Sequence, residues 1–172
     1  PYKKEVVKTK LESISFRGPD YMGIEKVNQL TLGHLRLSIL DLDARSHQPM
    51  VFENLHIVFN GEVYNYKDIK KELLSLGYHF KTESDTEVLL IGYKAWGKDV
   101  LHKTNGMFAF SIYDSTTNKI FSARDRLGVK PFYYYWKDGE FEICSQIRPL
   151  LDKKKINEDA ISMFLDCMFI PS

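Results

Sequence analysis

Predicted strands in this chain come in runs instead of alternating one by one with helices, and this order limits the folds open to it. Apolar spacing predicts helices over residues 3–15, 67–76, 84–96 and 157–169, and strands within 29–40, 55–59, 107–113, 119–123, 131–136 and 141–145. Parallel strands need a long crossover, usually a helix, between them. The order therefore indicates an α+β domain whose mainly antiparallel sheets are covered by helices.

Size and charge exclude several classes of protein. The chain has 172 residues, a formal net charge of +1 and a hydrophobic fraction of 44%, which predicts a folded domain with a core and not a disordered segment. Balanced charge argues against nucleic acid or an anionic membrane as the main partner. No apolar run reaches the ~20 residues of a membrane span, and residues 1–10 do not resemble a secretory signal. We therefore expect a cytoplasmic domain.

The cysteines and histidines do not suggest a metal centre. Cys144 and Cys167 are far apart and belong to no C-x-x-C pair, which favours reduced thiols over a disulfide framework or a zinc site. The five histidines are scattered through unlike sequence contexts. We expect no metal ion and no other cofactor in this domain.

The segment Asn60-Gly61-Glu62 follows a strand-forming run and has two interpretations. An Asn-Gly pair is the strongest short signal for a hairpin turn, since both residues tolerate positive φ, and taken alone this interpretation is favoured. The alternative is an oxyanion hole, in which the Asn60 amide and the Gly61 N–H converge on one carbonyl oxygen. The missing side chain of Gly61 then lets a substrate approach closely, and Glu62 is placed to hold an ammonium group.

Two further charged residues are open to a structural and a functional interpretation. Arg36 lies within an apolar alternation; it is either an outward-facing strand residue or a bidentate clamp on a substrate carboxylate. Asp85 stands at the predicted start of a helix, where the helix dipole stabilises a carboxylate. It serves as an ammonium ligand as well only if that helix end faces a pocket.

Seven motifs in one order are more specific than any of these residues alone. They are RGPD (17–20), HLRLSI (34–39), HQP (47–49), NGEVYNY (60–66), SDTE (84–87), GMFAF (106–110) and ARDRLGVK (123–130). Over essentially the whole chain they closely resemble the glutaminase domain of asparagine synthetases. Such domains are class II glutamine amidotransferases with the N-terminal-nucleophile hydrolase fold, and the RGPD form of the first motif resembles the asparagine synthetase branch.

This resemblance implies a role for each candidate residue and a layered fold. Arg36 would bind the α-carboxylate of glutamine, with the backbone around Leu37 and Leu40 lining the pocket. Asn60 and Gly61 would form the oxyanion hole. Two carboxylates, Glu62 and Asp85, would hold the glutamine α-ammonium. The implied fold is an αββα sandwich, in which two mainly antiparallel sheets are stacked between helical layers, and residues 1–172 would be one amidotransferase domain.

The sequence departs from this family at the nucleophile. The family uses an N-terminal cysteine whose α-amine acts as the base, whereas residue 1 here is Pro1. We expect that the first strand, which carries the cysteine, is absent from this chain, and that the chain alone is inactive and less stable than a longer form. Cys144 and Cys167 are poor replacements, because both lie in apolar segments where thiols are usually inert. Pro1 as an imine base is a remote alternative.

The resemblance also implies partners outside this chain. A C-terminal synthetase domain would use ATP and Mg²⁺ to activate aspartate and would accept ammonia from glutamine; the full protein would form a homodimer. Sugar acids or other carboxylates are alternative acceptors. A second hypothesis, from a different functional class, is that the chain is a non-catalytic module, which binds glutamine or a partner without cleaving it. A stand-alone domain that docks on a separate synthetase subunit is the third hypothesis.

Overall fold

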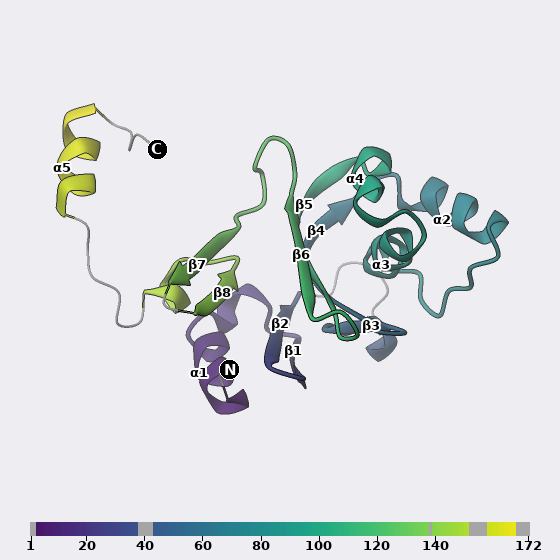
Figure 1. The fold of residues 1–172 in the computed structure, drawn as a ribbon, viewed down its shortest axis with the longest axis horizontal. Helices are drawn as coiled ribbons and strands as arrows, with labels where there is room; N and C mark the ends of the chain where they lie inside the picture. The colour runs from purple at the N-terminus through teal and green to yellow at the C-terminus, as the bar shows by residue number, and fades with distance from the viewer. Residues whose placement is uncertain (1–2, 38–42, 138, 152–157, 168–172) are drawn as a thin grey trace.

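A four-stranded antiparallel sheet forms the centre of the molecule (Figure 1). The computed structural model describes residues 3–37, 43–137, 139–151 and 158–167, with only the backbone of Cys167. In spatial order the strands are β3 (Met50–Phe52), β4 (Leu55–Val63), β5 (Gly106–Asp114) and β6 (Lys119–Arg124). The central pair, β4 and β5, stays in register over its whole length, from Leu55 opposite Asp114 to Val63 opposite Gly106.

Helices α2 (Tyr66–Ser75), α3 (Asp85–Trp96) and α4 (Val100–Lys103) cover one face of this sheet. The main core lies between them, because strand residues such as Ile57 and Phe110 pack against the fully buried Leu90 and Ile91 of α3. Every residue from the start of α3 to Gly92 is buried. Helix α3 is therefore the central helix of the domain, and its first turn is fixed against the sheet.

Two separate hairpins lie on the opposite face of the sheet (Figure 1). One consists of β1 (Tyr21–Val27) and β2 (Leu30–Arg36), and the other of β7 (Tyr133–Lys137) and β8 (Glu140–Cys144). Helix α1 (Lys4–Glu12) lies outside both, and α5 (Glu158–Cys167) projects away from the body. The predicted α+β class with antiparallel sheets is confirmed, although the second layer is divided into these two hairpins among the described residues.

Side-chain hydrogen bonds fix the first hairpin against the central sheet. The Asn28 Nδ2, in the turn between β1 and β2, donates to the Ser115 backbone oxygen at 2.9 Å and to the Tyr113 hydroxyl at 3.0 Å. Asn28 has φ 51°, a left-handed conformation that asparagine tolerates. Halfway along β2, His34 contacts the backbone of β4. The hairpin is thus attached to the sheet at its tip and at its middle.

Several predicted boundaries are confirmed, and two strands were missed. The helices over 67–76 and 84–96 end at Gly77 and Gly97 as expected, and Ser84 caps α3 by accepting a bond from the Glu87 N–H. Strands β1 and β3 were not predicted, because β1 mixes charged and apolar residues and β3 has only three residues. Short 3₁₀ turns occur at Ser15–Arg17, Ala44–Ser46, Gly97–Asp99 and Arg148–Leu150.

Candidate active site

The Asn60-Gly61-Glu62 segment lies inside β4 and not in a turn. Asn60 pairs with Ala109 and Gly61 with Phe108, and the ladder continues to Val63. The hairpin interpretation is therefore wrong. Gly61 has φ 152°, and a Cβ atom placed there would lie 2.1 Å from the Met107 backbone oxygen. The residue must be glycine because β5 approaches it closely, a reason that the sequence pattern does not contain.

One edge of β4 has no strand partner beyond β3 among the described residues. Strand β3 pairs only with Leu55–Ile57, and further along the edge side chains take over the pairing. The Phe59 N–H donates to Gln48 Oε1 at 2.6 Å, and the Val63 N–H donates to Asp85 Oδ2 at 2.9 Å. Gly61 lies between these two residues and directs its N–H to the same edge, since alternate strand residues do so.

The donors of Asn60 and Gly61 are unsatisfied in the described part of the chain. The Asn60 Nδ2 is buried without a hydrogen-bond partner, and the Gly61 N–H has no acceptor within the described ranges. Buried donors without partners are rare because each costs about 1–3 kcal/mol. The half-buried Gly61 N–H is next to Asn60 in the chain, and two donors that converge on one point can hold an anionic oxygen.

His34 contacts the same part of β4 and carries no charge at neutral pH. Its Nε2 lies 3.2 Å from the Phe59 backbone oxygen, which fixes the tautomer, because only an N–H can bond to a carbonyl oxygen. Burial lowers the pKa of His34 to about 4, the Phe59 bond opposes this shift and Arg36 adds to it. The other ring nitrogen, Nδ1, is buried and without a partner in the described residues.

Arg36 points inward, so its interpretation as an outward-facing strand residue is wrong. Its side chain is only 5% exposed, and Nη1 donates to the Asp43 backbone oxygen at 3.0 Å. Arg36 and His34 are two residues apart on β2 and therefore share one face. The RGPD motif supports this strand end, since Gly18 packs against its backbone and the Asp20 N–H donates to the Arg36 oxygen.

Two other predicted pocket residues lie near the end of β2 in the sequence. The Leu37 side chain is 58% exposed, so only its backbone is available for the predicted pocket lining. Leu40 lies outside the described residues.

Asp85 connects the start of α3 to the end of β4. Ser84 is the helix cap, and the Asp85 carboxylate instead accepts the bond from Val63. Its pKa is raised, chiefly because burial disfavours the charged form, and the nearby Glu62 carboxylate raises it further. Two neighbouring carboxylates repel each other when both are ionised, and burial of one of them adds to this cost. A cation placed between them would lower the free-energy cost of ionising both.

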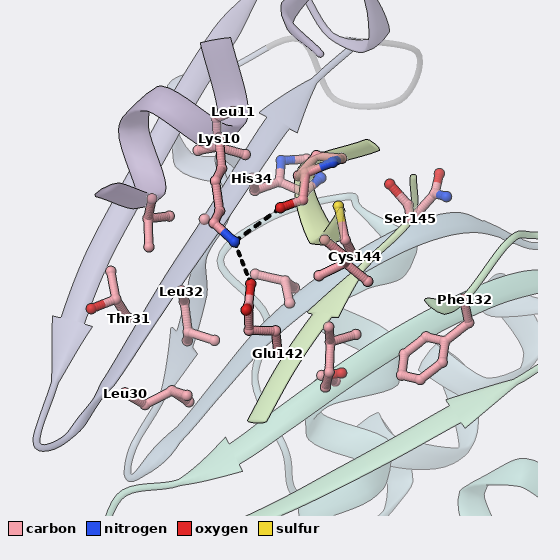
Figure 2. A pocket seen from close by; sticks show the side chains of 18 of the residues that line it. Lys10, Leu11, Leu30, Thr31, Leu32, His34, Phe132, Glu142, Cys144 and Ser145 are labelled. Carbon is pink, nitrogen blue, oxygen red and sulfur yellow. Dashed lines mark hydrogen bonds and ion pairs between the residues drawn. The ribbon is translucent and has the colours of Figure 1, made fainter. Parts of the chain in front are cut away.

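A cavity of about 540 Å³ lies beside Asn60, between the two hairpins (Figure 2). Residues 29–35 of the first hairpin line one wall, residues 139–145 of the second line the other, and β4 and β5 form the floor. Helix α1 closes it from outside, where Lys10 Nζ donates to Glu142 Oε2 at 2.5 Å and to the Pro149 oxygen at 2.9 Å. In the described residues β1 is the one strand paired with β2, apart from a bridge between Pro19 and Arg36, and β7 is the one strand paired with β8. Each wall therefore includes a strand whose second edge is not paired with another strand.

Cys144 lines this cavity but is not an activated thiol. It lies half-buried on β8, and burial raises its pKa above the usual value. Reactive cysteines have a lowered pKa because the thiolate is the nucleophile. The Cys167 side chain and Pro1, the other groups considered as replacements, lie outside what the structure describes.

The described residues contain no cluster of three or more His, Cys, Asp or Glu side chains that could hold a metal ion. This finding concerns metal ions alone, and the absence of any cofactor from this domain stays a prediction. No helix in the described ranges is long and apolar enough to cross a membrane.

The sequence missed two residues of this region, His34 and Gln48. Both were within recognised motifs, HLRLSI and HQP, but neither was given a role. The usable signal for His34 was its position two residues before Arg36 on one strand, which places both on the same face. No comparable signal exists for Gln48, because its bond to β4 arises from tertiary packing.

Comparisons with known proteins show similarities in sequence and in fold. A family model described as a glutamine amidotransferase domain matches residues 2–172. Asparagine synthetase (glutamine-hydrolysing) 3 of Bacillus subtilis is 39% identical over 87% of this chain, and asparagine synthetase 1 of the same organism is 35% identical over 98%. The chain spans only 26% and 27% of the lengths of these two relatives.

Among solved structures, a glutamine phosphoribosylpyrophosphate amidotransferase from B. subtilis matches the fold. The match covers 87% of this chain and 40% of that chain, with a TM-score of 0.72 and 21% identity. The chain therefore has a fold similar to that of this amidotransferase.

Proposed function

This chain belongs to the glutamine amidotransferase domain family, and from that premise we propose that it is the glutaminase domain of a glutamine-hydrolysing asparagine synthetase. The observation that carries the proposal is the buried Asn60 Nδ2 without a partner, next to the Gly61 N–H on an open strand edge between the bonds made by Gln48 and Asp85. A tetrahedral intermediate of amide hydrolysis carries its negative charge on one oxygen, and two such donors stabilise it.

Charged residues near these donors fit the two charged groups on the α-carbon of glutamine. Arg36, a buried guanidinium at the end of β2, would bind the α-carboxylate through charge-assisted hydrogen bonds. Glu62 and Asp85 would hold the α-ammonium, and its positive charge would offset the burial that now raises the Asp85 pKa. Leu37 and Leu40 would contribute backbone to the same pocket.

The nucleophile in this proposal is a cysteine from a segment outside the 172 residues. Its thiolate attacks the side-chain amide carbon of glutamine, and the carbonyl electrons move to the oxygen held by Asn60 and Gly61. When they return, the carbon–nitrogen bond breaks, the nitrogen takes the proton that the α-amine had removed from the thiol, and ammonia leaves. Water then hydrolyses the thioester to glutamate and restores the thiol.

The cavity between the hairpins is the place for that segment. One extended strand inserted there would pair with the second edges of both β2 and β8, and would join two hairpins into a five-stranded sheet. Its course along the cavity would bring it past Asn60, which lines the floor. A nucleophile on this strand would therefore reach the donors without any movement of the central sheet.

The remaining assignments concern the longer protein. We propose that residues 1–172 are one amidotransferase domain, and that a synthetase domain following it uses ATP and Mg²⁺ to amidate aspartate. A homodimer and a cytoplasmic location are part of the same proposal. The acceptor is the least constrained element, and a sugar acid or another carboxylate is the alternative. A non-catalytic glutamine-binding module is the second candidate function, because Arg36, Glu62 and Asp85 can bind glutamine without a nucleophile.

Glutamine-dependent ammonia release tests the proposal. We expect release from the protein with its native N-terminus and none from the 172-residue chain. Replacing Arg36 by Met should raise the KM for glutamine about 30-fold, because a charge-assisted hydrogen bond is worth ~2 kcal/mol. Glutamine binding to both proteins, followed by calorimetry, separates the candidates. Binding without ammonia from either protein supports the non-catalytic module, and no binding at all contradicts both functions.

Inserting the proposed strand should also stabilise the domain. Open strand edges leave backbone groups unpaired and favour aggregation, so we expect the longer domain to unfold at a higher urea concentration than residues 1–172. Urea denaturation of the two proteins, followed by circular dichroism, measures the difference. Equal midpoints would show that the cavity does not receive a strand.

A further inference from the structure

We propose that His34 and Gln48 form a clamp on the Phe59 backbone that positions the Asn60 and Gly61 donors for reaction. Both would be positioning residues, which act through Phe59 and do not touch the substrate. The inference rests on the proposed function, because the donors need careful positioning only if they stabilise an oxyanion. It gives a role to the glutamine of the HQP motif, which the function assigned so far does not use.

The clamp replaces a missing strand. At Phe59 the central sheet continues on one side through β5, but β3 has already ended on the other. In a complete sheet a neighbouring strand would bond to both backbone groups that point to this edge. Here a side chain bonds to each: Gln48 Oε1 accepts from the Phe59 N–H at 2.6 Å, and His34 Nε2 donates to the Phe59 oxygen at 3.2 Å.

Each half of the clamp is anchored in a different element. Gln48 is 7% exposed, and its Nε2 donates to Thr86 Oγ1 at 3.4 Å in the first turn of α3. His34 belongs to β2, in the hairpin on the other face of the sheet. The Phe59 backbone is therefore held between the helical layer and the hairpin layer.

The bond from His34 acts on the peptide unit that leads directly to Asn60. The carbonyl of Phe59 and the N–H of Asn60 belong to one plane, so a fixed carbonyl fixes the direction in which Asn60 starts. Oxyanion donors must lie about 2.7–3.1 Å from the developing charge. Loss of either bond would let this edge turn toward other partners and would misplace the donors, while Arg36, Glu62 and Asp85 would still bind glutamine.

Kinetics of the protein with its native N-terminus test the clamp. Gln48→Met and His34→Leu keep side-chain bulk. His34→Leu removes the bond to the Phe59 oxygen, and Gln48→Met removes the bond from the Phe59 N–H together with the bond to Thr86. We expect kcat to fall about tenfold in each while KM stays within about twofold. His34→Gln can place an N–H near the position of Nε2, so its kcat should stay within about threefold of wild type. In an Asn60→Ala background the clamp variants should add little, because they act through that residue.

Asn28→Gly is the matched control. It removes the hydrogen bonds that hold the tip of the same hairpin, and glycine accepts the φ of 51° found there. It should lower stability and leave kcat unchanged. A rise in KM at constant kcat, or equal losses in His34→Gln and His34→Leu, would overturn the clamp.

A second measurement tests the clamp even if the protein releases no ammonia, in which case the proposed glutaminase function fails separately. Amide hydrogen exchange of the 172-residue chain should show a protected Phe59 N–H that loses at least tenfold protection in Gln48→Met and keeps it in Asn28→Gly. Unchanged protection in Gln48→Met would overturn the proposal.

Discussion

Replacing Gly61 by alanine should lower the free energy of unfolding by about 3 kcal/mol or more, a large effect for one added methyl group. The new Cβ would lie 2.1 Å from the Met107 oxygen and 2.6 Å from the Phe108 Cα. Both are backbone atoms of the neighbouring strand, so neither can rotate away. The substitution can be accommodated only if β4 and β5 move apart at the centre of the sheet, where the core is packed.

Gly77→Ala is the control for this experiment. Gly77 has φ 88°, so alanine is also disfavoured there by its backbone conformation, but nothing lies within 4 Å of a Cβ atom at that position. We expect it to cost about 1–2 kcal/mol. Urea denaturation of both variants and the wild type measures the two costs. Similar costs for Gly61→Ala and Gly77→Ala would mean that strand contact does not determine the glycine at position 61.

Acidification from pH 7 to pH 4 should destabilise the 172-residue chain through His34. Its pKa is about 4 in the folded chain, against an ordinary value of 6.5. Because the unfolded state binds the proton more readily, the stability that His34 contributes is complete above pH 6.5 and is lost as the pH falls toward 4. The loss is about 2 kcal/mol at pH 5 and about 3 kcal/mol at pH 4.

Comparison with His34→Gln isolates this effect. Other groups titrate in both proteins: Asp85 has a pKa raised by burial, so its protonation favours the folded state as the pH falls. Hydrogen bonds hold the pKa of Asp114 and of Asp125 below 3.8, so their contributions are lost only at lower pH. The stability difference between wild type and variant should therefore change by about 3 kcal/mol between pH 7 and pH 4. A constant difference would contradict a neutral, buried His34.

Features that depend on neighbours in the chain were predictable. Helix α3 starts after Ser84 because a serine hydroxyl can accept from the N–H three residues later, and it ends at Gly97 because glycine adopts positive φ. The α+β class was predictable because strands follow one another along the chain, and the connections between strands determine the type of sheet. Strand β1 was missed because it is stabilised by pairing with β2 and not by an apolar alternation of its own.

The same distinction between local sequence and tertiary contacts applies to the candidate residues. Residue type and motif order were enough to select Arg36, Asn60, Gly61, Glu62 and Asp85, because few side chains can bind a carboxylate, an ammonium group or an oxyanion. Only the tertiary structure decided that Arg36 is buried, that Asn60 and Gly61 lie in a strand, and that His34 and Gln48 hold that strand. An Asn-Gly pair can lie in a turn or at a strand edge. What distinguishes the two cases here is the close approach of the β5 backbone to Gly61, and the residues in contact lie more than forty positions apart in the chain.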